Sequence, residues 1–334
     1  MKITHTHPSV RLTGRWDTSD PNVAVTTNTG AYIEFAFEGN MALALFDTYD
    51  NARPVLHLWV SVDGGAMIES PIDDYLRIVT PTFGKHTVRI IYKGGMEATA
   101  RWCSKLHGKV TFLGVETDTP AELCEDNRAT IEFVGDSITE GVLTDDDFKQ
   151  LELFSYDIDQ QNRVYQDDVC ATYAWLTAEA LNLRPIVMGF GAVGVTRGGQ
   201  GGVPAAYMAY PYNFDGSPIT HTPSDVVIIN HGANDRGRTA ENYLEKYALT
   251  LDEIRKYNPD AVIVALSAFC GAFHEELAPF IKIYNEKNGC NVHYIDTFGW
   301  IPLSPLHPLR DGHRKVAENL VPLIRDMINK KPNK

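Results

Sequence analysis

The stretch that decides the fold is residues 131–141, IEFVGDSITEG. Its first residues are apolar β-formers, and they stop at the tight turn Gly135-Asp136-Ser137, after which the sequence becomes more polar. This pattern predicts a strand that ends by holding the Ser137 hydroxyl at the carboxyl edge of a sheet, where open α/β sheets bind ligands. A lone Gly-Asp-Ser is more often an ordinary turn with a serine capping a helix, so the function of Ser137 depends on the rest of the chain.

Downstream of this stretch, strand and helix patterns alternate. We expect strands at residues 184–190, 225–230, 261–267 and 291–296, and helices at 171–183, 239–257, between the last two strands, and at 312–328. Such alternation predicts a doubly wound, mostly parallel sheet. The long acidic segment 145–168 is expected to form a loop or a lid over the site.

Upstream, residues 31–116 show apolar side chains at every second position, with Gly and Asp at short intervals and no convincing helix. This periodicity favours an antiparallel β-sandwich. Residues 116–130 are polar, contain Pro120 and lack periodicity, which indicates a domain boundary. We therefore expect an all-β domain at 1–118, a linker at 119–129 and an α/β domain at 130–334.

Composition excludes several classes of function. The 334 residues are 44% hydrophobic and 22% charged, as in a soluble globular protein, and the net charge of −13 disfavours binding to nucleic acid or to an anionic membrane. The five cysteines are scattered without a CxxC pair, which indicates reduced thiols and neither disulfides nor a zinc site. The amino terminus has no apolar run, so a cytoplasmic protein is expected unless a leader has been removed. No particular oligomer is predicted.

Four loops at strand ends carry chemistry. They hold Ser137, Gly194 in the sequence GAVG, Asn234 in the sequence GAND, and His307 before Pro308. Each has an ordinary explanation when taken singly: Gly194 as a turn, Asn234 as a helix cap, and His307 as one of 11 histidines. Taken together they supply a nucleophile, a base and donors for a tetrahedral oxygen, which is what acyl transfer requires.

In these four blocks the sequence resembles the SGNH (GDSL-type) hydrolases. The matching residues are GDSIT at 135–139, Gly194, GAND at 232–235 and HPLRDGH at 307–313. The resemblance implies a flavodoxin-like three-layer α/β/α domain with Ser137 as nucleophile and His307 as base. It also implies an oxyanion hole made by the Ser137 and Gly194 backbone N–H groups and the Asn234 amide, with no metal and no organic cofactor.

The β-rich front half, with GRWD at residues 14–17, is similar in layout to carbohydrate esterase family 2, in which a jelly-roll precedes the SGNH domain. This resemblance implies a serine esterase that removes acetyl groups from carbohydrates of the xylan or mannan type, with the acetylated sugar as its only expected partner. Two alternatives remain at this point: a lipase or thioesterase using the same residues, and a carbohydrate-binding protein whose catalytic site has decayed.

One position departs from the family pattern. The family places an Asp three residues before the catalytic histidine, and here that position is Ser304. A carboxylate there orients the imidazole and stabilises its cation, and its loss costs about 10⁴-fold in turnover in serine proteases. We therefore expect a Ser137–His307 dyad whose second imidazole nitrogen is held by a backbone carbonyl, by Asp296 or by Asp311. Ser304 can accept a hydrogen bond but supplies no charge.

Aromatic side chains near these loops are candidates for lining a sugar pocket. Trp300, Phe190 and Tyr210 fit this role by position, with core packing as an equal alternative for each. In the front half, Trp16, Trp59 and Trp102 are interpreted as core residues more readily than as a sugar-stacking platform. Asp235, next to Asn234, is expected to shape its loop, with a catalytic role as the less favoured alternative.

Overall fold

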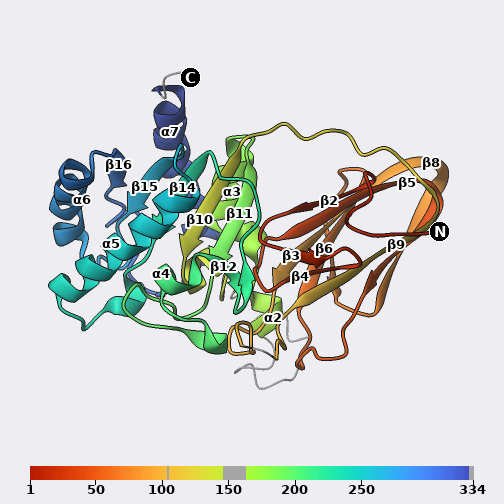
Figure 1. Cartoon of the computed structure of the whole chain (residues 1–334), viewed down its shortest axis with the longest axis horizontal. Coiled ribbons are helices and arrows are strands. Elements are labelled where there is room, and N and C mark those ends of the chain that lie inside the picture. The colour runs from red at the N-terminus through yellow and green to blue at the C-terminus, as the bar shows by residue number, and fades with distance from the viewer. Residues whose placement is uncertain (104, 146–162, 331–334) are drawn as a thin grey trace.

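The computed structural model describes residues 1–103, 105–145 and 163–330. It contains a strand-rich unit and an α/β unit that lie side by side (Figure 1). The last strand of the front unit, β9 (Val110–Pro120), and the first strand of the second unit, β10 (Thr130–Gly135), are joined by a segment without helix or strand. The division into domains at 1–118 and 130–334 stays a prediction.

The front unit is one nine-stranded sheet in which every pairing is antiparallel. The strand order is β3-β4-β9-β5-β8-β6-β7, with β1 on β9 and β2 on β5. The remaining strands are β1 (Lys2–Ile3), β2 (Val10–Thr13), β3 (Asp17–Asp20), β4 (Val23–Thr26), β5 (Tyr32–Phe46), β6 (His57–Val62), β7 (Ile68–Pro71) and β8 (Tyr75–Gly94). The sequence predicted strands only from residue 31 because β1 to β4 have two to four residues, too few to show a period of two.

The second unit is built on a five-stranded parallel sheet of order β11-β10-β14-β15-β16. The further strands are β11 (Arg184–Gly189), β14 (Val226–Asn230), β15 (Val262–Leu266) and β16 (Val292–Ile295). Numbered along the unit, this is the 2-1-3-4-5 order of flavodoxin-like folds. All five residues of β14 are buried, as expected for a strand covered on both faces. The predicted doubly wound sheet is confirmed.

Helices cover both faces of this sheet. Val227 and Ile229 pack with the side of the sheet that carries α5 and α6, whereas Ile228 packs with the side that carries α3 and α7, so the unit has three layers. The helices are α1 (Ser137–Glu140), α2 (Arg163–Gln166), α3 (Tyr173–Ala180), α4 (Ala206–Ala209), α5 (Ala240–Tyr257), α6 (His274–Asn288) and α7 (Arg310–Lys330). A short hairpin of β12 (Tyr212–Phe214) and β13 (Ser217–Pro218) and 3₁₀ turns at Val169–Ala171, Gln200–Gly202 and Ala233–Asp235 complete the unit.

Most of the predicted acidic loop or lid, residues 146–162, lies outside the described residues. The end of that segment contains α2. Strands and helices alternate along the chain from β10 onward, as the sequence predicted. Among the described residues, no helix is long and apolar enough to cross a bilayer. The cellular location stays a prediction.

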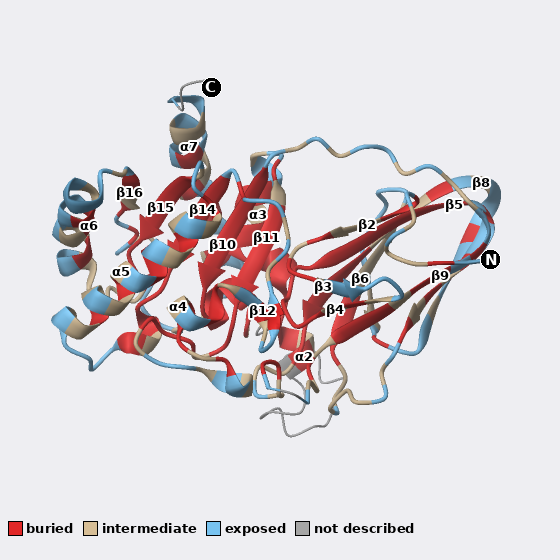
Figure 2. Ribbon diagram, in the orientation of Figure 1, coloured by how far each residue is buried: buried red, intermediate tan, exposed pale blue. Residues whose placement is uncertain are grey.

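A buried ion pair joins the two units. Arg15 of the front unit donates from Nε and Nη2 to Glu132 Oε1 at 3.0 and 2.7 Å, and both side chains are fully buried. Arg15 Nη1 also donates to the carbonyl oxygen of Tyr210 at 2.8 Å, and the Tyr210 hydroxyl donates to Glu132 Oε2 at 2.8 Å. Although burial works against it, the Arg15 charge lowers the pKa of Glu132 below its ordinary value. Figure 2 shows that the strands of both units are largely buried.

A second buried ion pair lies closer to Ser137. Arg101, on the connection between β8 and β9, donates from Nη1 to Glu140 Oε1 and from Nη2 to Glu140 Oε2 at 3.3 Å. Thr29 Oγ1 donates to the carbonyl oxygen of the same Glu140 at 2.9 Å. Lys93 is buried as well, and its Nζ donates to the carbonyl oxygens of Val164 and Asp167 at 3.1 and 2.9 Å. The front unit is therefore attached to the segments that surround the Ser137 turn.

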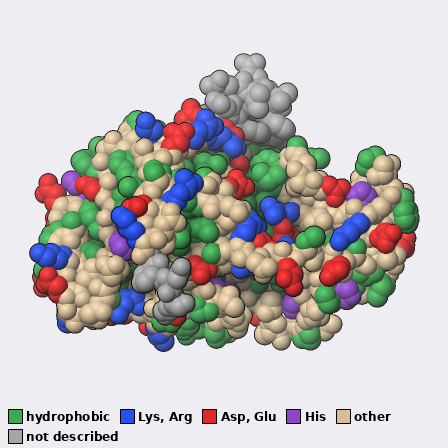
Figure 3. Space-filling view, turned by 90° about the horizontal axis from the view of Figure 1, so that it is seen from above, with side chains coloured by type: hydrophobic (Ala, Val, Ile, Leu, Met, Phe, Trp, Pro, Cys, Tyr) green, Lys and Arg blue, Asp and Glu red, His purple; other side chains and the backbone are tan. Residues whose placement is uncertain are grey.

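The surface carries no dominant charge on the face that Figure 3 shows, where acidic and basic side chains are interspersed.

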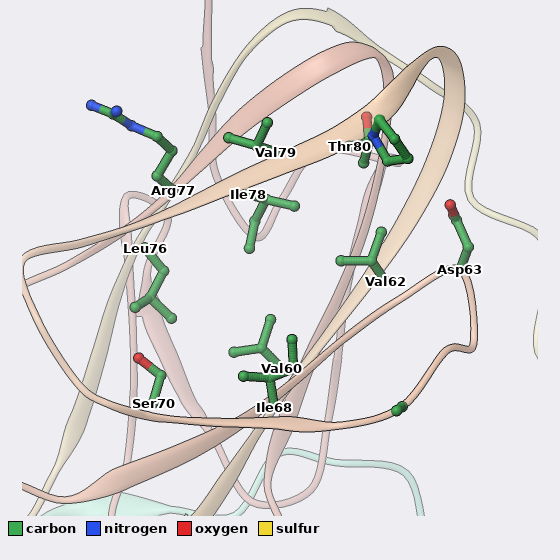
Figure 4. A pocket seen from close by; sticks show the side chains of 12 residues that line it. Val60, Val62, Asp63, Ile68, Ser70, Leu76, Arg77, Ile78, Val79 and Thr80 are labelled. Atoms are coloured by element: carbon green, nitrogen blue, oxygen red, sulfur yellow. The ribbon is translucent and has the colours of Figure 1, made fainter.

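A cavity of about 550 Å³ opens in the front unit between β6, β7 and β8 (Figure 4). Its lining is mostly aliphatic, with Val60, Ile68, Leu76 and Ile78 among its residues, and it contains neither a histidine nor an aromatic ring. This cavity therefore lacks a histidine base and a flat face on which a sugar would stack.

We predict that Arg15→Met lowers the free energy of unfolding by roughly 3–5 kcal/mol, because it leaves the Glu132 carboxylate buried without its cation. Urea unfolding followed by tryptophan fluorescence measures this loss. The double variant Arg15→Met/Glu132→Leu, which removes both charges, recovers most of it, whereas Arg314→Ala, which breaks an exposed pair with Asp311, changes stability by less than about 1 kcal/mol. A loss below about 1 kcal/mol for Arg15→Met contradicts the structural role given to this pair.

Candidate active site

The Ser137 turn is built by its neighbours. Strand β10 ends at Gly135, and Asp136 then caps α1 by accepting a hydrogen bond from Ile138 N at 3.0 Å. A Cβ on Gly135 would lie 2.1 Å from Thr139 Oγ1, so only glycine allows the chain to turn this sharply. Gly141 ends the helix with a φ of 96°, a left-handed conformation that favours glycine. The turn presents Ser137, which is 6% exposed, at the carboxyl edge of the sheet.

His307 lies against this serine. The distance between Ser137 Oγ and His307 Nε2 is 2.8 Å, although 170 positions separate the two residues in the chain. His307 is half-buried and precedes α7, whose predicted start at residue 312 is found at Arg310. A hydroxyl and an imidazole at hydrogen-bond distance are the arrangement by which a general base activates a serine nucleophile. The structure thus brings together the two predicted reactive residues.

Asn234 lies beside them in the 3₁₀ turn that follows β14. Its Nδ2 donates to Asp136 Oδ2 and to the carbonyl oxygen of Val193, both at 3.1 Å. These two acceptors fix the side-chain amide at the edge of the site. The backbone N–H of Ser137, in the first turn of α1, has no acceptor within its own helix. Both N–H groups of the Asn234 amide thus have acceptors within the protein, and the roles of Asn234 and Ser137 as donors to a tetrahedral oxygen stay predictions.

Gly194 does not fit the predicted oxyanion hole. Its N–H donates to the carbonyl oxygen of Arg197 at 3.0 Å, so this donor is engaged inside its own loop. Close packing explains why position 194 is a glycine, because a Cβ on Gly194 would lie 2.5 Å from Asp235 Oδ1. From this loop it is Ala192, with a φ of 59°, that lines the site. The prediction for Gly194 is therefore corrected, because a required glycine can reflect close packing instead of an approach to substrate.

Asp235 holds two of the loops together. Its Oδ1 accepts from Thr196 N at 2.8 Å and from Thr196 Oγ1 at 2.6 Å, and its Oδ2 accepts from Val195 N at 3.2 Å. The loop after β11 is thereby attached to the turn that carries Asn234. This agrees with the loop-shaping role that the sequence predicted.

A cavity of about 80 Å³ lies at the dyad. Its lining residues come from four segments of the α/β unit and one of the front unit: Glu97, Ser137, Ile138, Ala192, Ala233, Asn234, Leu306 and His307. The sequence analysis missed Glu97 because it lies in a half of the chain that shows no catalytic motif. No local signal would have revealed it, since its place in the site depends on how the two units pack.

The aromatic residues predicted to line the pocket lie elsewhere. Phe190 is 1% exposed and packs edge-on to Trp102, with ring centroids 6.3 Å apart. Tyr210 is fully buried at the Arg15–Glu132 pair, and Trp300 packs against the hydrophobic cluster under α3 and α7. Phe190 and Tyr210 therefore follow the alternative of core packing, because large rings gain more free energy by full burial than by lining a small cavity. Trp300 is only partly buried, and a role for it in binding substrate stays a prediction.

The candidates for orienting His307 have other partners. Asp296 Oδ1 accepts from Ser267 Oγ at 2.8 Å and from Phe298 N at 3.0 Å. The side chain of Asp311 is 93% exposed and pairs with Arg314 at 3.3 Å. Ser304 is exposed. None of these contacts involves His307, so the prediction that one of these side chains holds its second nitrogen finds no support in this geometry.

Burial shifts the titration of several groups around the site. It raises the pKa of Asp136 to about 7, with the nearby Asp235 charge adding to the effect and the Ile138 N–H opposing it. Burial also lowers the pKa of His313 to about 3, with the neighbouring His307 contributing in the same direction, and lowers that of His231 to about 4. Both buried histidines are therefore neutral near pH 7. Among the described residues, no group of three or more His, Cys, Asp or Glu side chains is arranged to hold a metal ion.

The three-layer fold and the contact between Ser137 and His307 form the arrangement that a hydrolase with a serine nucleophile requires. Residues 133–315 match the GDSL-like Lipase/Acylhydrolase family over more than half of the chain. The chain belongs to this family.

Known proteins resemble the chain beyond this region. Cellulase/esterase CelE of Acetivibrio thermocellus is 26% identical over 278 residues, which cover 77% of this chain but only 31% of CelE. A family two carbohydrate esterase from Cellvibrio japonicus has the same fold, with a TM-score of 0.81, 19% identity and coverage of 98% of both chains. The acetyl xylan esterase Est2A from the rumen bacterium Butyrivibrio proteoclasticus has a TM-score of 0.77, 18% identity and coverage of 98% of both chains. The match to these structures includes the front unit as well as the α/β unit.

We predict that Asp136→Asn changes how stability depends on pH. The raised pKa means that the folded protein binds a proton between pH 3.8 and about 7 that the unfolded chain releases, so Asp136 costs stability as the pH rises through this window. The difference in unfolding free energy between variant and wild type should shift in favour of the variant by roughly 4 kcal/mol across it. Urea titrations at several pH values measure this difference in unfolding free energy. A difference that does not vary with pH would contradict the prediction.

We also predict that Asp296→Asn and Asp311→Asn each leave turnover within a few-fold of wild type, because neither carboxylate contacts His307. Steady-state hydrolysis of 4-nitrophenyl acetate provides the measurement. A fall approaching the 10⁴-fold loss known for a triad carboxylate, in either variant, would identify that residue as the missing third member.

Proposed function

We propose that the protein is a serine esterase that removes acetyl groups from acetylated carbohydrate of the xylan or mannan type. The observation that carries the proposal is the 2.8 Å contact of Ser137 Oγ with His307 Nε2 at a small cavity. The similarity in fold to a family two carbohydrate esterase and to an acetyl xylan esterase supports the choice of substrate. Because the chain matches only about a third of CelE, activities of the rest of that protein are not carried over.

The mechanism follows from the positions of the side chains. Ser137 Oγ attacks the acetyl carbonyl carbon while His307 Nε2 takes the hydroxyl proton. The tetrahedral oxygen that forms carries negative charge, and the Ser137 N–H stabilises it together with the Asn234 amide, which exchanges one of its two present acceptors for this oxygen. His307 then gives its proton to the departing sugar oxygen. A water molecule, activated in turn by His307, attacks the acetyl-serine and releases acetate.

The size of the cavity favours a short acyl group. A cavity of about 80 Å³ is small beside the roughly 300–1,000 Å³ of most ligand pockets, and this suits an acetyl group. Its apolar lining from Ile138, Ala192 and Ala233 suits the acetyl methyl. A lipase or thioesterase would need room for a long acyl chain, so this alternative is disfavoured. A decayed site is disfavoured because the Ser137–His307 hydrogen bond is intact.

In this proposal the front unit is a jelly-roll that supports the catalytic unit. The support for the finer assignment is that the first part of β5 pairs with β2 and the later part with β9, while β8 pairs along the other edge of the strand. The buried Arg15–Glu132 and Arg101–Glu140 pairs are the means by which this unit holds the Ser137 segment.

We predict that the protein releases acetate from acetylated xylan or glucomannan and that Ser137→Ala lowers kcat by at least about 10³-fold, because the nucleophile is lost. Acetate release from acetylated xylan, acetylated glucomannan and short acetylated oligosaccharides, compared side by side, measures this activity. A fluorophosphonate probe should label wild type at Ser137 and leave the variant unlabelled.

The preferred length of the acyl chain distinguishes an acetyl esterase from a lipase or thioesterase. Hydrolysis of 4-nitrophenyl acetate should exceed that of 4-nitrophenyl octanoate in kcat/KM, because the small cavity buries an acetyl group better than the longer chain. Faster cleavage of the octanoate ester overturns the acetyl assignment, and failure of the probe to label wild type supports the decayed alternative instead.

A further inference from the structure

Among the residues that the structure describes, Glu97 is the one acidic side chain that lines the cavity with Ser137 and His307. It comes from the connection between β8 and β9 in the front unit, and the α/β unit supplies every other residue of the lining. The mechanism proposed above assigns it no task. The lining of the proposed esterase site therefore contains a carboxylate whose role the mechanism does not explain.

The segment that carries Glu97 is fixed in place. The carbonyl oxygen of Glu97 accepts from Arg101 Nη2 at 3.2 Å, and the same guanidinium is buried against Glu140. Arg101 N donates to the carbonyl oxygen of Gly201 at 2.9 Å, and Thr99 Oγ1 donates to that of Met96 at 2.7 Å, which closes the turn. The backbone around Glu97 is thus held to both units.

The α/β unit leaves space for this carboxylate. A Cβ on Gly191 would lie 2.0 Å from Glu97 Oε2 and 2.7 Å from Glu97 Cβ. The glycine at the end of β11 therefore lets the Glu97 side chain lie directly on the loop that also carries Ala192. Because the Glu97 side chain packs closely against this loop, its carboxylate has a fixed position next to the cavity.

The charge of Glu97 restricts which part of a substrate it can face. The reaction builds negative charge on the acetyl oxygen, and a carboxylate near that oxygen would repel it. A carboxylate only accepts hydrogen bonds, whereas a sugar hydroxyl can donate one. The part of an acetylated sugar that fits Glu97 is therefore a free hydroxyl of the leaving group, near the ester oxygen.

We infer that Glu97 recognises the alcohol part of the substrate by accepting a hydrogen bond from a free sugar hydroxyl adjacent to the acetylated position. This deepens the proposed function and rests on it. The recognition favours neutral, partly acetylated sugars over esters that lack a neighbouring hydroxyl, and over uronic acids, whose carboxylate Glu97 repels. The front unit thereby selects the substrate in addition to supporting the fold.

The test compares Glu97→Ala and Glu97→Gln with wild type on three esters. These are a methyl xyloside carrying one acetyl group, its deoxy analogue in which the hydroxyls beside the ester are replaced by hydrogen, and 4-nitrophenyl acetate. Glu97→Ala should lower kcat/KM for the first ester by about tenfold or more, as expected for a lost hydrogen bond to a charged group. The other two esters should change by less than about twofold.

Glu97→Gln keeps an acceptor but removes the charge, so it should raise the ratio of kcat/KM for an acetylated methyl glucuronoside to that for the acetylated methyl glucoside. Glu122→Ala, at an exposed glutamate outside the site, is the matched control and should leave all rates unchanged. Thermal melting of each variant verifies that it is folded.

An equal loss of kcat/KM on all three esters would overturn the inference and assign Glu97 a purely structural role. No loss of kcat/KM on any of the three esters would also overturn the inference. An unchanged ratio for the glucuronoside in Glu97→Gln would contradict the electrostatic part. A wild-type protein that cleaves 4-nitrophenyl acetate but no sugar acetate would refute the proposed function itself, which is a distinct result.

Discussion

The structure depends on the buried contact of Arg101 with Glu140. Glu140 lies three residues after Ser137, so the short helix that holds the nucleophile ends in a carboxylate with almost no access to water. A buried carboxylate is costly unless a cation compensates it, and that cation comes from the front unit. The same guanidinium holds the backbone of Glu97. One ion pair thus links the nucleophile turn, the junction of the two units and the mouth of the cavity.

This linkage explains why the two units act as one structure. The Arg15–Glu132 pair repeats the same arrangement on strand β10, the strand that leads to Ser137. Both acidic partners belong to the short stretch 131–141 with which the sequence analysis began, and both cations come from the front half of the chain. The stretch therefore carries the nucleophile and also the two buried charges that require the front unit.

Local patterns in the sequence predicted the parallel sheet, the Ser137 turn and the His307 and Asn234 loops, because each depends on residues close together in the chain. The predictions that were wrong depend on distant contacts. Gly194 is a glycine because Asp235 packs against it, and Phe190 and Tyr210 are aromatic because they fill the core. Glu97 could not be found in the sequence since only the packing of the two units brings it to the site.

The central claim is that Ser137 itself carries the acetyl group between the two half-reactions. The most direct measurement is mass spectrometry of peptides from protein quenched in acid during turnover of an acetyl ester. The account predicts one acetyl group on the peptide that contains Ser137, and none on that peptide in Ser137→Ala. Turnover with the acetyl group on another residue, or with no acetylated peptide and full activity in Ser137→Ala, would contradict it.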